Sequence, residues 1–240
     1  MLWRRAVYNC STFIQNTLFP ASCLLCGDPT RGEEDLCRPC RGELPLNRSA
    51  CPRCARPLAS KATPCGACQS HPPPFDALIA ALRYEPPVDR LIQGLKFDHR
   101  LESARLLGHL LAEAIVAMPH EPPELLLPVP LHAARLRRRG FNQALELARP
   151  LAARLGIPIG RNYCRRRRPT EEQTRLPAKG RRANVRGAFE VIRPLQVRRV
   201  VVLDDVVTTG STVGELTRTL RRAGAERVEV WACARAARPR

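Results

Sequence analysis

The sequence predicts an α/β fold in which a mainly parallel sheet is flanked by helices and preceded by a small cysteine-rich segment. From Phe75 onward, short apolar runs alternate with amphipathic helical patterns, and this alternation is typical of a parallel sheet with crossover helices. The run from Val200 to Leu203 is unbroken, as in a central strand that is buried on both faces. Before Phe75, large apolar side chains are scarce, so this segment cannot bury enough surface to fold unaided.

Hydrophobic periodicity gives the expected elements of the α/β domain. Strands are expected at 77–84, 125–129, 200–203 and 227–234. Helices are expected at 88–97, 103–118, 141–155 and 212–223. The expected domains are a short amphipathic helix over residues 1–20, a cysteine-rich domain over 21–71 and, after a stiff three-proline linker, an α/β domain over 75–240.

The chain carries 40 Lys and Arg against 22 Asp and Glu, which gives a formal net charge of +18. Such an excess of positive charge attracts phosphates, nucleic acid or anionic surfaces, although arginine also coats ordinary protein surfaces. No apolar stretch approaches the length of a membrane helix. The apolar residues between Trp3 and Phe19 are interrupted by Arg and Asn, unlike a secretion signal. We therefore expect a cytoplasmic protein with no membrane span.

Eight of the 11 cysteines form four Cys-x-x-Cys pairs: Cys23 and Cys26, Cys37 and Cys40, Cys51 and Cys54, and Cys65 and Cys68. Each pair can direct two thiolates at one ion, so eight thiolates suit two structural Zn²⁺ ions in tetrahedral sites. The gaps between successive pairs are equal, and spacing therefore does not decide the pairing. We favour sequential sites, and a cross-braced arrangement stays open. A thioredoxin-like redox pair would need a flanking βαβ pattern, and this segment has none.

The end of the apolar run from Val200 carries the most informative chemistry. Asp204 and Asp205 follow it directly, and a turn then leads into a helix. The turn consists of Thr208, Thr209, Gly210, Ser211 and Thr212. Its hydroxyls and backbone N–H groups suit a phosphate at the helix N-terminus, beyond the carboxyl end of a parallel strand. The two acids suit a sugar diol or its Mg²⁺ if the strand ends before them, and the structural alternative for the turn is a capping box between Thr212 and Glu215.

These residues resemble a known family. Residues 200–212 resemble the phosphoribosyl pyrophosphate (PRPP) motif of type I phosphoribosyltransferases. Further motifs are similar to those of the ComF family of competence proteins, which includes the GntX-like proteins; they lie at 19–27, 127–131, 139–144 and 170–189. The resemblance covers nearly the whole chain, and Arg-Gly-Phe-Asn-Gln at 139–143 is its most specific element. It implies a type I phosphoribosyltransferase-like parallel sheet preceded by a double zinc ribbon.

The resemblance also implies roles for individual residues. Asp204 and Asp205 would hold the ribose hydroxyls, and the turn from Thr208 to Thr212 would hold the 5-phosphate of PRPP bound with Mg²⁺. Arg139 and Gly140 lie in the turn at 131–140 where such enzymes bind pyrophosphate. Gln173 and Arg181 lie in the loop at 168–187 that closes over the substrate. Gly180 stands where the family usually has an acid, which puts an ion pair at that loop in doubt.

Three functions are compatible with these motifs. The first is a protein that binds PRPP or a nucleotide without turnover, and the second is a protein that handles single-stranded DNA in uptake and competence, with DNA-uptake or recombination proteins as partners. These two are compatible with each other. The alternative is an active phosphoribosyltransferase of nucleotide metabolism or salvage. Such transfer often needs no protein nucleophile, so the lack of a Ser/His/Asp set is no objection, and no catalytic residue is assigned.

Overall fold

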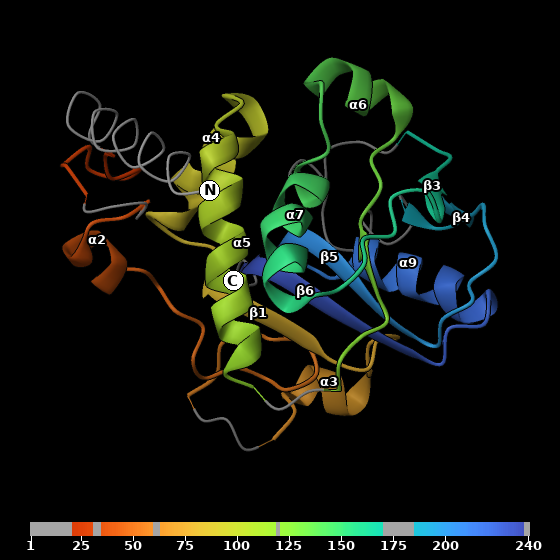
Figure 1. Cartoon of the computed structure of the whole chain (residues 1–240). Coiled ribbons are helices and arrows are strands. Elements are labelled where there is room, and N and C mark those ends of the chain that lie inside the picture. The colour runs from red at the N-terminus through yellow and green to blue at the C-terminus, as the bar shows by residue number, and fades with distance from the viewer. Residues whose placement is uncertain (1–20, 31–34, 60–62, 119–120, 170–184, 238–240) are drawn as a thin grey trace, which may run out of the picture. The chain divides into compact units, whose positions relative to one another are not determined.

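The computed structural model describes residues 21–30, 35–59, 63–118, 121–169 and 185–237 (Figure 1). The helix expected over residues 1–20 lies outside this part. The chain forms two compact units, Met1–Leu44 and Pro45–Arg240. In chain order the elements are α2 (Arg38–Gly42), α3 (Gly66–Ser70), β1 (Leu78–Arg83), α4 (Val88–Phe97), α5 (Leu101–Val116), β2 (Leu125–Pro128), α6 (Ala133–Arg139), α7 (Gln143–Leu155), β3 (Cys164–Arg166), β4 (Phe189–Val191), β5 (Arg199–Val207), α9 (Ser211–Arg222) and β6 (Arg227–Arg235).

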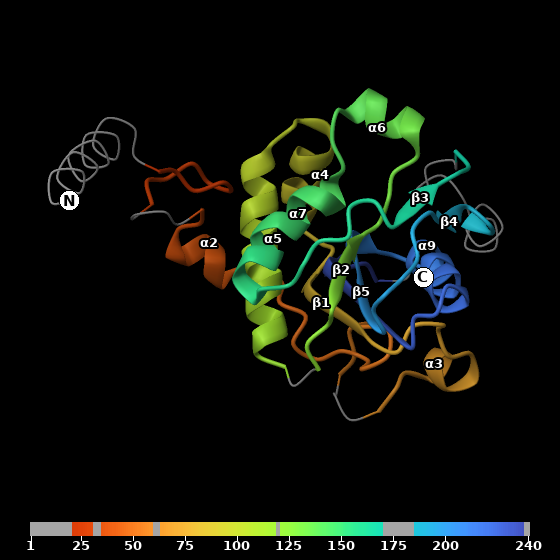
Figure 2. The ribbon, with the colours of Figure 1, turned by 45° about the vertical axis from the view of Figure 1, so that its right-hand side comes forward.

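The larger unit is built on a four-stranded sheet in the order β1-β6-β5-β2, and all three neighbouring pairs are parallel. The central strands β5 and β6 are buried along almost their whole length, as their β-branched side chains require. Helices α5 and α7 contact each other and pack on the sheet, while α9 contacts β4, β5 and β6 (Figure 2). The structure therefore has the parallel sheet flanked by helices that the sequence predicts.

Close packing between α5 and α7 depends on a glycine. A Cβ atom built on Gly108 of α5 would lie 2.6 Å from Cγ of Pro150 and 3.0 Å from the carbonyl oxygen of Leu147, both on α7. Neither distance is compatible with a side chain, so only glycine lets the helices approach this closely. This contact holds α7, and with it the residues at its N-terminus, against the sheet.

The second half of the cysteine-rich segment belongs to the larger unit. The backbone N–H of Arg83 at the end of β1 donates to the carbonyl oxygen of Pro45 at 2.8 Å. Asn47 donates its side-chain amide to Ala55 and Ala80 at 3.0 and 3.3 Å. Ala55 is itself part of the buried core that α9 and the sheet share. The second cysteine cluster is therefore packed into the α/β core.

Two details of the fold differ from the sequence predictions. The segment at 131–140 contains a short helix, α6, in place of a plain turn, and Gly140 ends it in the left-handed conformation at φ +81°. Strand β5 continues to Val207, beyond the predicted end at Leu203. Parallel pairing with β6 runs as far as Val207 opposite Arg235, which keeps the backbone extended past the acids.

Candidate functional site

The paired cysteines form two clusters with sequential pairing. Each cluster brings four Sγ atoms within 4.8 Å of one another. One contains Cys23, Cys26, Cys37 and Cys40, and the other contains Cys51, Cys54, Cys65 and Cys68. Sγ atoms from different pairs are 3.7 Å apart in the first cluster and 3.8 Å apart in the second. A tetrahedral ZnS₄ site with Zn–S bonds of about 2.3 Å has edges of about 3.8 Å, so both clusters fit a structural Zn²⁺.

The electrostatics of the second cluster also fit a cation. Burial opposes ionisation of Cys51, but N–H groups outweigh it and bring its pKa to about 6. The strongest of these, the backbone N–H of Cys65, donates to Sγ of Cys51 at 3.2 Å. Burial raises the pKa of Cys68, and the neighbouring Cys54 raises it further. One thiolate thus hinders the next, and a bound divalent cation would offset that repulsion.

The predicted phosphate loop joins the end of β5 to the start of α9. Gly210 takes the N-cap position in the left-handed conformation, at φ +79°, which favours glycine. The hydroxyls of Thr209 and Ser211 are 2.8 Å apart, and the backbone N–H of Ser211 donates to Thr209 Oγ1 at 3.3 Å. The loop therefore presents hydroxyls at the N-terminus of a helix of three turns, where the helix dipole favours an anion.

The capping-box alternative for this loop is wrong. Gly210, not Thr212, is the N-cap residue, and it has no side chain with which to form a capping box. Glu215 instead accepts a hydrogen bond from the backbone N–H of Gly187 at 2.9 Å and pairs with Arg218 at 3.0 Å. Glu215 therefore ties the segment before β4 to α9.

Asp204 and Asp205 lie inside β5, so their side chains alternate between the faces of the sheet. This corrects the expectation that the strand ends before them. The two carboxyls still lie within hydrogen-bonding reach of each other. Asp205 is buried, and Gln143 of α7 donates to its Oδ1 at 3.3 Å.

Lys96 of α4 forms an ion pair with Asp205. Burial opposes ionisation of Asp205, but Lys96 outweighs it and lowers the pKa of this carboxyl. Burial would likewise lower the pKa of Lys96, but Asp205 raises it. Burial, followed by the charge of Asp205, raises the pKa of Asp204 well above its ordinary value. The acid pair therefore consists of one carboxylate with a built-in counter-ion and one carboxyl that resists ionisation.

The predicted pyrophosphate residues connect to this pair. Arg139 at the end of α6 donates from Nη1 to Oε1 of Gln143 at 2.6 Å, and Gln143 in turn contacts Asp205. The guanidinium of Arg139 also lies 5.6 Å from the ring centroid of Phe97, the neighbour of Lys96. Gly140 lies at the end of the same helix. Cationic and polar groups from α4, α6 and α7 thus converge on the carboxyl end of β5.

Sequence reasoning did not place three cations, Lys96, Arg166 and Arg235, at this site. Lys96 sits within an ordinary amphipathic helix, Arg166 sits in a basic run, and Arg235 directly follows the strand expected at 227–234. Arg166 on β3 is buried, lies 5.4 Å from the ring centroid of Phe189, and has a pKa lowered to about 10 by burial and then by Arg135. No strand is predicted at 164–166, so no local pattern indicates that Arg166 is buried.

Arg235 connects the second cysteine cluster to the phosphate loop. Its side chain is buried at the end of β6, and burial lowers its pKa. Nε donates to the carbonyl oxygen of Cys54 at 2.8 Å, and Nη1 donates to the carbonyl oxygens of Val207 and Thr208. One guanidinium thus fixes a cysteine turn and the start of the loop together.

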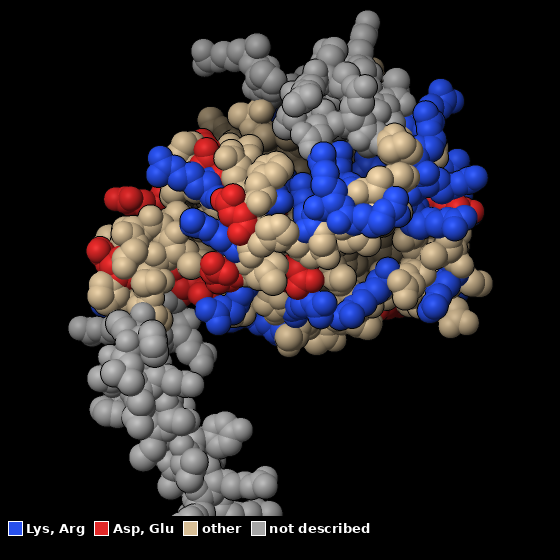
Figure 3. All heavy atoms as spheres, turned by 90° about the horizontal axis from the view of Figure 1, so that it is seen from above, with Lys and Arg blue, Asp and Glu red and all other residues tan. Residues whose placement is uncertain are grey.

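The remaining predicted residues of the closing loop, Gln173 and Arg181, lie outside the described residues. A basic surface is formed by described residues of α6 and of the segment around β3. Arg137 and Arg138 of α6 and Arg165, Arg167 and Arg168 near β3 are exposed. Figure 3 shows Lys and Arg gathered across this side of the molecule. Among the described residues, no helix is long and apolar enough to cross a membrane.

Comparison with known proteins agrees with this architecture. Residues 14–69 match the double zinc ribbon domain, and residues 141–240 match the phosphoribosyl transferase domain. Among solved structures, the chain is similar to glutamine PRPP amidotransferase from B. subtilis, at 23% identity over 54% of this chain and 25% of that one, with a TM-score of 0.34. Adenine phosphoribosyltransferase from Leishmania tarentolae matches at 17% identity over 56% of this chain and 71% of that one, with a TM-score of 0.35.

Relatives cover nearly the full length. The DNA utilization protein YhgH of Salmonella typhimurium is 38% identical over 90% of this chain and 97% of its own length, and that of Escherichia coli K12 is 37% identical over the same shares. Competence protein F of Haemophilus influenzae is 35% identical over 91% of this chain and 98% of its own. With the two ribbon clusters and the parallel sheet, these matches show that the chain belongs to the ComF family of double zinc ribbon, phosphoribosyltransferase-like proteins.

Proposed function

We propose that this protein binds PRPP, or the 5-phosphate of a nucleotide, at the carboxyl end of β5. The observation that carries the proposal is the loop from Thr208 to Thr212, which joins a buried parallel strand to a helix and exposes hydroxyls at that helix N-terminus. The helices that follow β2 and β5 contact different parts of the sheet, as at the switch points where α/β proteins bind ligands. The 5-phosphate would sit against this loop.

The acids and Arg139 would bind the ribose and the pyrophosphate of the ligand. Asp204 is the less buried of the two acids, and its carboxyl would accept hydrogen bonds from the ribose diol. Arg139, held by Gln143, would face the pyrophosphate. Carboxylate oxygens suit Mg²⁺, which would supply charge neutralisation for the pyrophosphate when bound. Because Lys96 already balances Asp205, Asp204 is the carboxyl of this pair that is available to share a metal with the ligand.

We propose further that the protein acts in DNA uptake, in handling single-stranded DNA with other uptake or recombination proteins. The names of its relatives, DNA utilization protein and Competence protein F, support this role. The net charge of +18 and the exposed arginines of α6 and of the segment around β3 also support this role. Aromatic residues make up only 5% of the chain, so we expect sequence-tolerant binding through backbone phosphates.

Active phosphoribosyl transfer is the second candidate function. The link from Arg139 through Gln143 to the acid pair favours it, because transfer needs the leaving pyrophosphate to be neutralised beside the ribose. Slow release of pyrophosphate from PRPP, faster with one of a panel of bases, would identify an enzyme. Binding without release would identify a sensor.

Thermal unfolding with PRPP, with and without Mg²⁺, tests the site. A ligand at about 100 times its Kd should add about 2.7 kcal/mol of stability to the wild-type protein. The variant carrying Asp204→Asn and Asp205→Asn should show no Mg²⁺-dependent shift. The control Asp89→Asn changes a half-buried acid in the first turn of α4, outside the proposed site, and should keep the full shift. A wild-type protein that gives no shift with PRPP or nucleoside monophosphates at millimolar concentration would refute the proposal.

A further inference from the structure

A large cavity lies beside the phosphate loop and away from the acid pair. Its volume is about 930 Å³, which is within the range of small-molecule sites. The second cysteine cluster with α3, the prolines that follow it, the Val185–Gly187 segment, the phosphate loop and α9 form its walls. All of these belong to the unit Pro45–Arg240. Neither Asp204 nor Asp205 lines the cavity, so it shares the phosphate loop with the proposed ribose-phosphate site but not the acid pair.

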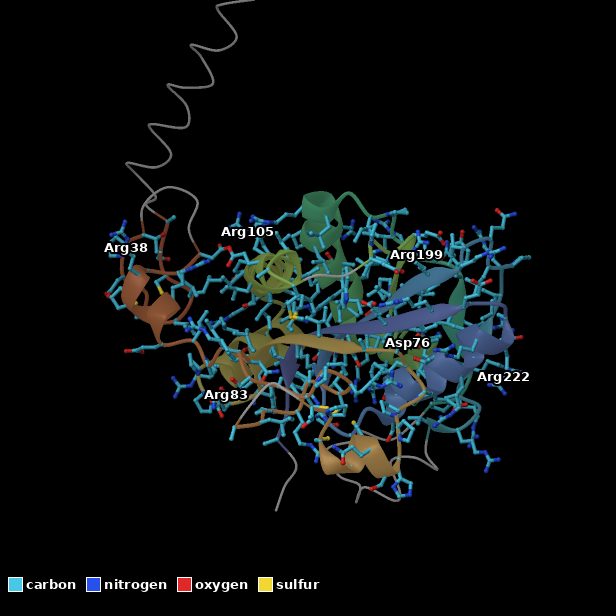
Figure 4. The ribbon with its side chains drawn as sticks, turned by 90° about the horizontal axis from the view of Figure 1, so that it is seen from below. Arg38, Asp76, Arg83, Arg105, Arg199 and Arg222 are labelled. Carbon is cyan, nitrogen blue, oxygen red and sulfur yellow. The ribbon has the colours of Figure 1, made fainter. Side chains whose placement is uncertain are left out.

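The walls of this cavity are strongly basic. Arg56, Arg186, Arg218 and Arg222 line it. Arg218 and Arg222 lie one turn apart on α9, and Figure 4 labels Arg222 at the end of that helix. The one acid in the lining, Glu215, is 8% exposed and is already bound to Gly187 and Arg218. The cavity therefore presents an excess of positive charge, as an anion site requires.

Arg56 adds a second, independent indication of a missing acceptor. It follows Cys54 of the second cysteine cluster and lines the cavity together with the arginines of α9. Its Nε atom is buried, and no hydrogen-bond acceptor lies within reach of it in the part of the chain that the structure describes. A buried guanidinium N–H without an acceptor is costly, and a bound anion would supply one. Arg235 does not contribute in this way, because its guanidinium is occupied by carbonyl oxygens.

The rest of the lining is flat and apolar. Pro72, Pro73 and Pro74 form one wall, with the ring of Phe75 beside Gly210 of the loop. Thr209 and Ser211 add hydroxyls. A ligand that matches both kinds of wall carries phosphate at one end and a flat, weakly polar ring at the other.

We propose that this cavity binds a nucleotide unit, with its phosphate held by Arg56, Arg218 and Arg222 and its base against the proline wall. The unit is either a free nucleotide or part of a single strand, since both carry the same phosphate and base. The proposal adds a site that shares the phosphate loop with the proposed ribose-phosphate site, and its arginines lie outside that loop, so it does not depend on PRPP binding. It also gives the zinc ribbon a role in recognition, because Arg56 and α3 are held by its cysteine turn.

Binding of two probes by the full-length, zinc-loaded protein tests this site. Fluorescence anisotropy measures a labelled oligo(dT), and calorimetry measures dTMP, with inorganic phosphate as competitor. The variant carrying Arg218→Gln and Arg222→Gln should bind the preferred probe at least about tenfold more weakly, and its salt slope for oligo(dT) should fall by about 0.7, the value for one phosphate contact. Arg56→Gln, at the second cysteine cluster, should weaken the same probe independently.

Arg149→Gln is the matched control. Arg149 pairs with Glu146 at 3.0 Å and i,i+3 spacing, as Arg218 does with Glu215, but it lies on α7 and does not line the cavity. This control should bind both probes like the wild type. Unchanged affinity for both probes in the Arg218/Arg222 variant and in Arg56→Gln would overturn the proposal. Displacement by inorganic phosphate as effective as by dTMP would overturn the assignment of a nucleotide.

The two sources of the nucleotide are separated by the probes themselves. If dTMP binds directly and competes with oligo(dT), a free nucleotide is sufficient for binding at this site. If oligo(dT) binds and dTMP does not, the ligand is part of a strand. The same variants also distinguish binding in this cavity from binding at the acid pair. Asp204→Asn with Asp205→Asn should lose the PRPP shift and keep probe binding, whereas the arginine variants should keep the PRPP shift. Loss of both properties in the arginine variants, with a wild-type thermal midpoint, would mean that only one site exists.

Discussion

Lys96→Met should destabilise the protein by about 3 kcal/mol. The substitution keeps a straight side chain of similar length and removes the cation paired with Asp205. The side chains of Lys96 and Asp205 are 23% and 4% exposed, so removal of the cation leaves a carboxylate buried without its counter-ion. Breaking a buried pair costs about 3–5 kcal/mol. We expect the low end of this range because Lys96 is partly exposed and Gln143 still donates to Asp205.

A double-mutant cycle separates the ion pair from the loss of side-chain packing. Asp205→Asn keeps an oxygen that can accept from Gln143 and leaves Lys96 with a route to solvent. Removing both charges in one protein should cost less than the sum of the two single changes. We expect a coupling energy of about 1–3 kcal/mol, as for residues in direct contact.

The effect of pH has a defined sign. The pKa of Asp205 is lowered in the folded protein, so its contribution to stability is present above the ordinary carboxyl range and is lost as pH falls through the folded value. Lys96→Met abolishes this contribution, because burial alone raises the pKa of the carboxyl. The difference in unfolding free energy between wild type and variant should therefore be largest near neutral pH and shrink under acid.

Denaturant unfolding in excess zinc measures these free energies while both cysteine clusters stay filled. Arg90→Met is the control, because Arg90 lies exposed on the same helix, and a surface change of this kind shifts stability by no more than about 0.5 kcal/mol. The reasoning is refuted if the coupling energy between Lys96 and Asp205 is within about 0.5 kcal/mol of zero, which is the value for independent sites.

Three further predictions concern the cysteine clusters, Arg235 and Gly108. Cys51→Ser and Cys23→Ser should each lose one of two zinc ions by metal analysis, but only Cys51→Ser should lower the thermal midpoint of the α/β unit, which contains its cluster. Arg235→Met removes the donor of hydrogen bonds to four carbonyl oxygens and should cost about 3 kcal/mol in denaturant unfolding and weaken PRPP binding, whereas unchanged affinity would separate the loop from the ribbon. Gly108→Ala should cost about 1–3 kcal/mol by overpacking against Pro150, and a neutral result would mean that α5 and α7 can separate freely.

Local sequence patterns were sufficient for most of the fold. Helix α4 has the predicted bounds, and α5, α7 and α9 begin and end within two residues of theirs. These helices have an apolar stripe facing the sheet, which periodicity detects directly. Helix α6 was missed because none of its residues is buried, so its sequence has no such stripe. Its start is set by the side chain of His132, which accepts from the backbone N–H of Ala134, and its end by Gly140.

The candidate site likewise contains residues that sequence alone locates and residues that it does not. The Cys-x-x-Cys pairs, the acids and the Thr/Gly/Ser turn each have a local signature, and sequence alone located them. The residues that contact these groups have no local signature. Lys96 reaches Asp205, and Arg235 reaches the loop, only because the parallel sheet brings distant segments together. The end of β5 was also misplaced, because pairing with β6 holds the acids in the strand against their low intrinsic preference for it.

The placement of the acids within β5 has a consequence for their roles. Because a strand alternates its side chains, Asp205 is directed to the α4 and α7 side, where Lys96 and Gln143 occupy it. Asp204 is the less buried of the two acids in β5, and burial and the charge of Asp205 make its own ionisation unfavourable. A ligand that brings a cation or hydroxyl donors to Asp204 relieves that cost, whereas a ligand at Asp205 would first have to displace Lys96. The two adjacent acids are thus not equivalent: we infer that Asp205 orders α4, α7 and β5 around the site, and that Asp204 meets the ligand.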